Sequence, residues 1–143
     1  MLVKDIMTRN VVAVRPDTTL KELTRLLIDN RINGVPVVTG DNRIAGVITM
    51  TDLLKILRDI NYWDSIEKIK PGIGVKEALI KEKEYVIVEK KMSRNVSTVS
   101  EDDSVDHVID IMCKHNIHTI PVVKDDQLVG VIGATDIVKI CFL

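Results

Sequence analysis

The segment Gly-Val-Ile-x-x-Thr-Asp occurs twice in the chain, ending once at Asp52 and once at Asp136. In each copy a β-branched apolar run precedes the aspartate and apolar residues at helical spacing follow it, which predicts a strand that gives way to a helix there. An ionised carboxylate at such a junction can accept hydrogen bonds from ligand hydroxyls, and the first N–H groups and dipole of the helix favour an anion. Thr-Asp is also an ordinary helix start that requires no ligand, so both interpretations stay open.

The residue three positions before the aspartate differs between the copies. Thr49 offers a further hydroxyl, whereas its counterpart Gly133 offers none, so we expect the two sites to differ. Phosphates need cations, and the nearest ones in the repeated segments are Arg31, Lys114, His115 and His118.

Other chemistry finds little support in the sequence. Cys113, His115 and His118 could suggest a metal site, but Cys113 and His115 point to different faces of a helix and no fourth ligand converges on them. The chain has no nucleophile elbow, no phosphate-binding Gly-Lys-Thr loop and no acid pair with a mechanism attached. We therefore predict no catalytic residues, no metal and no enzymatic activity.

The elements that position these residues follow the order β-α-β-β-α. Residues 11–14 read as a strand closed by a turn, and the capping box of Thr19 and Glu22 begins a helix that runs to about Asn30. Residues 35–38 and 44–48 read as an antiparallel hairpin, and a second helix starts at Thr51 or Asp52.

The whole unit is repeated. Residues 7–41 match 92–126, and residues 46–56 match 130–140 after a one-residue deletion in the second hairpin turn, with 18 identical positions. A repeated unit whose apolar face cannot be covered alone predicts that the copies pack against each other, as a pseudo-two-fold pair in a mixed α+β fold. We assign residues 1–58 to the first repeat, 59–86 to a linker with a short helix, and 87–143 to the second repeat.

The linker has no counterpart in the repeat. Val75, Ala78 and Leu79 suggest its short helix, and it holds Tyr62, Trp63 and Tyr85, three of the four aromatic residues. Trp63 is interpreted as a strut packed on the repeats, with a lid or a partner contact as the alternative.

Composition narrows the class of protein. The 143 residues carry a formal net charge of -1, which argues against nucleic acid as a partner. The sequence shows neither a signal peptide nor a membrane span, so we expect a cytoplasmic protein. Cys113 and Cys141 are too few for a disulfide framework and are predicted to be buried small hydrophobes.

Two copies of Met-Thr/Ser-Arg-Asn-Val, a helix, Val/Ile-Pro-Val-Val and Gly-Val-Ile-x-x-Thr-Asp resemble a tandem pair of cystathionine β-synthase (CBS) domains, the Bateman module. The resemblance covers nearly the whole chain outside the linker. It implies two clefts between the repeats that take AMP, ADP, ATP or S-adenosyl compounds, further pairing into a homodimer, and signalling to an effector protein.

The resemblance also implies roles for individual residues. Asp52 and Asp136 would hold the ribose, because one carboxylate can accept from both vicinal hydroxyls. Phosphate and ribose would be met by Thr49, Thr51, Thr135, Arg31, Lys114, His115 and His118. The adenine slot would be formed by Ile6, Met7, Val12, Gly34, Val35, Pro36, Met92, Thr98, Thr119, Ile120 and Pro121.

Our leading hypothesis is a non-catalytic regulatory module that binds an adenine nucleotide. One alternative is a sensor of S-adenosylmethionine or methylthioadenosine, and another is a ligand-free dimerisation module with empty clefts. Binding of single-stranded nucleic acid would need a basic stripe that this balanced composition does not show.

Overall fold

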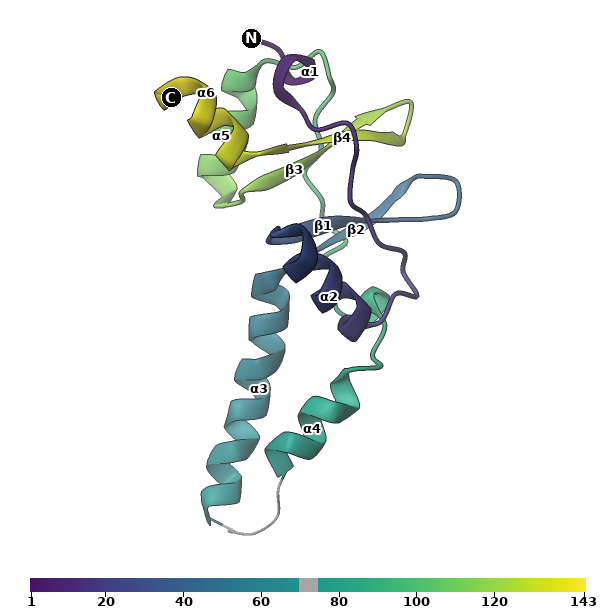
Figure 1. Ribbon diagram of the computed structural model, residues 1–143, viewed down its shortest axis with the longest axis vertical. Coiled ribbons are helices and arrows are strands. Elements are labelled where there is room, and N and C mark those ends of the chain that lie inside the picture. Colours follow the sequence, from purple (N-terminus) through teal and green to yellow (C-terminus); the bar gives the residue numbers. More distant parts are fainter. Residues whose placement is uncertain (70–74) are drawn as a thin grey trace.

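Two β-hairpins lie next to each other in the middle of the molecule, with helices on the outer side of each (Figure 1). The computed structural model describes residues 1–69 and 75–143, and the side chains of 61–76 and 79 are outside this description. The elements in chain order are α1 (Val3–Ile6), α2 (Leu20–Asn30), β1 (Gly34–Val38), β2 (Ile44–Thr49), α3 (Met50–Ile69), α4 (Val75–Lys83), a 3-10 helix (Val88–Lys90), α5 (Val105–His115), β3 (Thr119–Lys124), β4 (Gln127–Gly133) and α6 (Ala134–Phe142).

The first long helix of each repeat begins and ends in the same way. In α2 the Thr19 hydroxyl accepts from the Glu22 N–H at 3.2 Å, and the Glu22 carboxylate accepts from the Thr19 N–H at 3.0 Å, so the predicted capping box is confirmed. In α5 the hydroxyl of Ser104 accepts from the His107 N–H. Both helices end at a left-handed residue, Arg31 and Asn116. These matched ends fix where each hairpin begins.

The prediction that residues 11–14 form a strand is wrong. Only Val14 pairs, in parallel, with Val37 of β1, and Val99 pairs in the same way with Val122 of β3. The chain turns directly after Val14, where the Thr18 N–H bonds to the Arg15 carbonyl, so the ladder does not continue past Val14. The two hairpins themselves are antiparallel as predicted.

The leading segment of each repeat is exchanged into the other repeat. Thr8 forms a bridge with Val131 of β4, and Ser93 forms the matching bridge with Val47 of β2. Val3 and Met7 are buried in the core made otherwise by residues 99–137, while Val88 is buried in the core made otherwise by residues 14–60. Each hydrophobic core is therefore completed by chain from the other repeat.

The tips of the hairpins are joined directly. The Leu128 N–H donates to the Asn42 carbonyl at 3.1 Å, and the Asn42 amide donates back to the Leu128 carbonyl at 3.0 Å. Asn42 adopts a φ of 62°, a left-handed conformation that asparagine tolerates better than most residues. This link and the exchanged segments hold the repeats together at several separate places.

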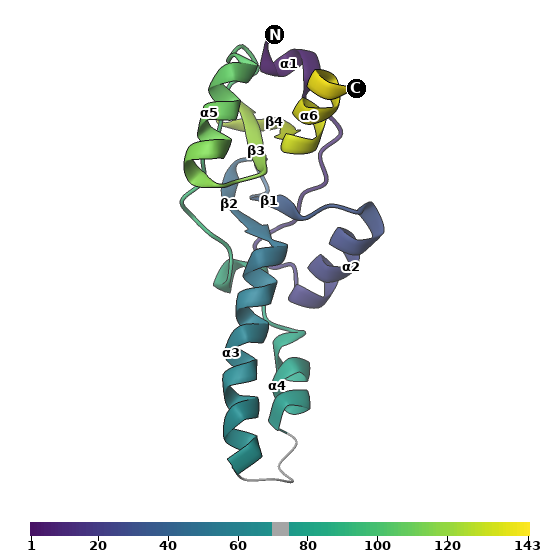
Figure 2. The ribbon, with the colours of Figure 1, turned by 90° about the vertical axis from the view of Figure 1, so that its left-hand side faces the viewer.

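Helix α3 runs well past the predicted end of the first repeat, to Ile69, and α4 lies alongside it, so that both extend away from the hairpins (Figure 2). The predicted helix near Val75 is α4. The residues Tyr62 and Trp63 lie in α3, and the role predicted for Trp63 falls outside the described side chains. Tyr85 is 71% exposed.

The prediction of buried cysteines is wrong. Cys113 and Cys141 are both exposed free thiols. Cys113 directly follows the buried Met112 and therefore lies about 100° around α5 from it, on the outer side. Among the described residues, no helix is both long enough and apolar enough to cross a membrane.

Candidate functional site

At the first strand-to-helix junction the aspartate caps its own helix. The Asp52 carboxylate accepts from the Thr49 N–H at 2.8 Å and lies 3.2 Å from the Thr49 hydroxyl, while the Thr49 hydroxyl lies 3.4 Å from the Asp52 nitrogen. The helix-start interpretation of Asp52 is thus realised in the structure. Both interactions of the Asp52 carboxylate use one oxygen, Oδ2, and within the described residues Oδ1 has no hydrogen-bond partner.

At the second junction the same aspartate lacks such a partner. Gly133 precedes α6 and makes no side-chain capping bond. The nearest atom to the place where a Cβ of Gly133 would lie is Oδ2 of Asp136, at 3.4 Å. Among the parts of the chain that the structure covers, the Asp136 carboxylate makes no hydrogen bond or ion pair. Gly133 lacks the hydroxyl that Thr49 supplies at the first junction, and the two junctions differ in this way.

Asp52 borders two adjoining cavities between the repeats. The first measures about 390 Å³ and lies between the β1–β2 hairpin with the start of α3 and the chain that enters β3. The second measures about 380 Å³ and continues toward Ser93, Asn95 and Ser97. Both are lined by Val47, Thr49, Asp52, Ile117, Thr119 and Pro121. Together they form one cleft, called here the Asp52 cleft, of a size that suits a small organic ligand.

The structure gathers about half of the predicted site residues at this cleft. Apolar and small residues of both hairpins stand near the carboxylate, with two histidines of the second repeat. The gathered residues are Gly34, Val35, Pro36, Thr49, Thr51, Asp52, His115, His118, Thr119 and Pro121.

The other predicted residues line neither cavity. Met7 and Ile120 are buried in the second core, where their side chains are not available to an adenine slot. Ile6, Val12 and Met92 pack against the cores from partly buried positions. Asp136 lies at the other junction, and the remaining residues are exposed away from the cleft: Arg31, Thr98, Lys114 and Thr135.

Sequence reasoning missed the cation closest to Asp52 along the helix. Lys55 lines the first cavity one turn after Asp52, since residues three apart lie on the same face of a helix. Its repetition as Lys139 was a signal that could have found it. The amides of Asn33 and Asn116 were also missed, and both line the same cavity because they lie where α2 and α5 have ended. The cleft therefore offers one carboxylate, one lysine and several neutral polar groups.

Known proteins share this architecture. The family model for the CBS domain matches residues 3–59 and 83–142, which leaves out the outer part of the α3–α4 extension. The uncharacterised protein MJ1426 of Methanocaldococcus jannaschii is 30% identical, and the match covers 97% of this chain and 90% of that protein.

A second relative is much longer than this chain. The L-aspartate semialdehyde sulfurtransferase of Methanocaldococcus jannaschii is 31% identical over 97% of this chain, which spans only 23% of that enzyme. Among solved structures, the CBS domain pair of protein MJ0100 in complex with 5'-methylthioadenosine and S-adenosyl-L-methionine is 30% identical with a TM-score of 0.73, over 99% of this chain and 95% of that one. With two matched repeats, exchanged leading segments and a cleft between the hairpins, this chain belongs to the CBS domain family.

Proposed function

We propose that the chain is a non-catalytic regulatory module that binds an adenosine-containing ligand in the Asp52 cleft. The observation that carries the proposal is the position of Asp52 at the border of both cavities, with its Oδ1 oxygen unused among the described residues. That oxygen can accept from ribose hydroxyls, while Oδ2 stays on the helix cap. Gly34, Pro36 and Pro121 offer apolar wall for the base.

An adenine nucleotide is the leading ligand class. Lys55 lines the same cavity as Asp52, so positive charge is available for a phosphate, and His118 lines the cavity from the second repeat and can add a hydrogen bond. The start of α3 lies at the same place, and although its Met50 and Asp52 N–H groups already donate to the Asn33 carbonyl and the Thr49 hydroxyl, the positive end of the helix dipole favours an anion there. AMP, ADP and ATP all fit this description.

An S-adenosyl or methylthioadenosyl ligand is the second candidate. The structure of the MJ0100 domain pair, at 30% identity, was described with both compounds. The second cavity supports this alternative, because Ser93, Asn95 and Ser97 are neutral polar residues that could meet an extension without phosphate.

Regulation follows from the location of the cleft. Its walls come from both repeats, so a ligand that prefers one relative orientation of the repeats shifts the population toward that orientation. We propose that an effector protein reads this shift, that the module acts as a homodimer, and that Asp136 marks a second and different site.

The test is a calorimetric titration of ligand-free protein with AMP, ATP, S-adenosylmethionine and methylthioadenosine at one salt concentration. We expect one class to bind with a Kd near the micromolar range, equivalent to about -8 kcal/mol. Preference for AMP or ATP supports the nucleotide sensor, and preference for the unphosphorylated compounds supports the second candidate. Heat signals at the buffer baseline with all four compounds would overturn both.

A further inference from the structure

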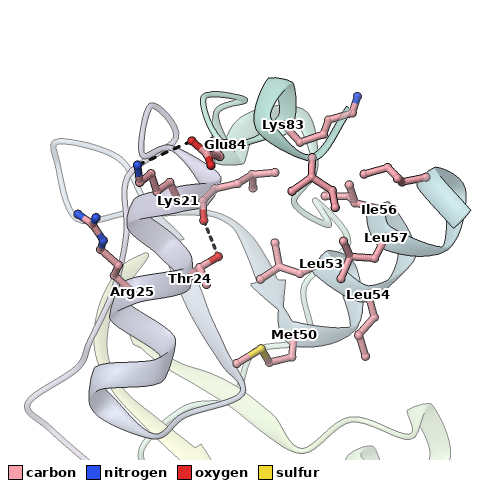
Figure 3. Close-up of a pocket in the computed structure, with 13 residues that line it drawn as sticks. Lys21, Thr24, Arg25, Met50, Leu53, Leu54, Ile56, Leu57, Lys83 and Glu84 are labelled. Atoms are coloured by element: carbon pink, nitrogen blue, oxygen red, sulfur yellow. Dashed lines mark hydrogen bonds and ion pairs between the residues drawn. The ribbon is translucent and has the colours of Figure 1, made fainter. Parts of the chain in front are cut away.

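An apolar groove lies on a different face of α3 from the Asp52 cleft. It measures about 570 Å³ and is bounded by α2, α3 and α4 (Figure 3). Lys55 of α3 lines the cleft and not the groove, whereas Leu53 and Leu57 line the groove and not the cleft. Met50 borders both. The groove is therefore a separate cavity, and its volume lies in the range of pockets that hold small organic ligands.

The floor of the groove is apolar. Leu20 and Ile56 are buried there, and Leu54 and Leu57 are 61% and 42% exposed along its side. The hydroxyl of Thr24 is turned away from an occupant, because it donates to the Leu20 carbonyl at 2.7 Å. Open apolar surface of this kind marks a binding site more often than a free surface. The floor offers hydrocarbon and few polar partners, which favours an aliphatic chain.

The α2 edge of the groove carries positive charge. Lys21 and Arg25 stand there one helical turn apart, and Lys83 stands on the α4 side (Figure 3). Lys21 is paired with Glu84 at 3.7 Å, whereas Arg25 makes no ion pair with any residue that the structure describes. A guanidinium group can bind a carboxylate through two parallel hydrogen bonds. Arg25 is therefore suited to the anionic head group of a ligand whose body is apolar.

Part of the groove is built by a segment outside the two CBS repeats. Ile60 and Ile80 line the groove, and both lie in residues 60–82, which the family model leaves out. Ile60 is 3% exposed and Ile80 is 38% exposed. The added segment thus converts one side of the first repeat into a cavity that is distinct from the cleft between the repeats.

We propose that this groove binds a long-chain fatty acid, with its hydrocarbon chain along the apolar floor and its carboxylate on Arg25. The chain is held by removal of apolar surface from water, and the head group by a charge-assisted contact at the α2 edge. A neutral ester of the same chain keeps the first contribution and loses the second. This inference does not rest on the adenosyl ligand proposed for the Asp52 cleft.

The test is a fluorescence titration of the full chain with cis-parinarate, a long-chain carboxylate whose fluorescence rises in an apolar site, and with its uncharged methyl ester. We expect cis-parinarate to bind and palmitate to displace it. Arg25→Gln should weaken cis-parinarate binding by about 10-fold and leave ester binding within about two-fold of the parent. Leu57→Glu places a charge in the apolar wall and should weaken both probes by about 10-fold or more.

The control is Arg58→Gln, which removes the same charge from an exposed position on α3 that does not line the groove. It should bind both probes as the parent does, and circular dichroism should show that every variant is folded. Equal affinity of Arg25→Gln and the parent for cis-parinarate would overturn the role of Arg25. Failure of both probes to bind the parent, or binding that Leu57→Glu leaves unchanged, would overturn the fatty-acid site in favour of a protein surface. None of these results bears on the titration with adenosyl compounds.

Discussion

The two strand-to-helix junctions carry the same Thr-Asp pair and use the aspartate differently. At the first, Thr49 and Asp52 form a helix cap beside a cleft of two adjoining cavities. At the second, Gly133 leaves Asp136 without a capping partner among the described residues. The difference teaches that a repeated motif does not imply a repeated site. The Asp52 carboxylate is held by hydrogen bonds at the start of its helix, and the Asp136 carboxylate has no such bonds among the described residues.

The largest expected effect concerns the glycine that opens each motif. A Cβ at Gly46 would lie 2.6 Å from the Ser93 carbonyl oxygen, and one at Gly130 would lie 3.0 Å from the Thr8 carbonyl oxygen. Gly46→Ala should therefore lower the free energy of unfolding by about 2–3 kcal/mol, and Gly130→Ala by about 1 kcal/mol less than that. Urea denaturation measures both. Equal losses would show that the exchanged segments fit the two repeats equally tightly.

The second expected effect is on ligand affinity. Asp52→Asn keeps an acceptor for the helix cap but removes the charge, so affinity for the bound adenosyl compound should fall by about 10- to 100-fold with little change in stability. Asp136→Asn is the matched variant. If calorimetry shows that the main binding event is lost in Asp136→Asn and kept in Asp52→Asn, the assignment of the primary cleft is reversed.

A smaller effect should separate the ligand classes. Lys55 lines the first cavity and its counterpart Lys139 lines neither cavity. Lys55→Met should weaken ATP binding by up to about 10-fold, the worth of one charge-assisted bond, and should leave methylthioadenosine binding within two-fold of the parent. Lys139→Met serves as the control, and a uniform loss for both ligands would assign Lys55 a structural role.

The smallest effect tests the cap itself. Thr49→Ala should cost about 1 kcal/mol, because it removes the hydroxyl from the reciprocal cap. Gly133→Thr should stabilise the fold by about 0.5–1 kcal/mol, since a Cβ there meets only ordinary contacts and the hydroxyl can pair with Asp136. Thermal unfolding of the two variants gives the comparison, and destabilisation by Gly133→Thr would mean that Asp136 already has a role that the new hydroxyl disturbs.

Local signals in the sequence were sufficient for much of the fold. The Thr19–Glu22 capping box, the hairpins and the repeat depend on neighbouring residues or on direct self-similarity, and the structure agrees with them. The pairing of Val14 alone was not predictable, because a short apolar run does not show how many of its residues find a partner.

The site was harder to predict than the fold for the same reason. Gly34 and Thr119 meet at one cleft only because the repeats pack together, and Met7 is taken away from it by joining the core of the other repeat. Hydrophobic periodicity shows that a residue is buried but not in which core. Lys55, by contrast, was missed although helical spacing from Asp52 was enough to find it.

The exchanged leading segments have a consequence for the order of events during protein synthesis. The first core contains Val14 and Leu23 together with Val88 of the second repeat. This core therefore cannot be completed until the ribosome has made Val88. The second core needs Val3 and Met7, which emerge first and stay uncovered until Ile132 and Ile137 follow. Because domains generally fold as units during translation, we expect neither repeat to complete its core before residues of the other repeat have been made. A nascent chain cut short after the first repeat has an unfinished core, and its apolar residues are then substrates for chaperones and proteases.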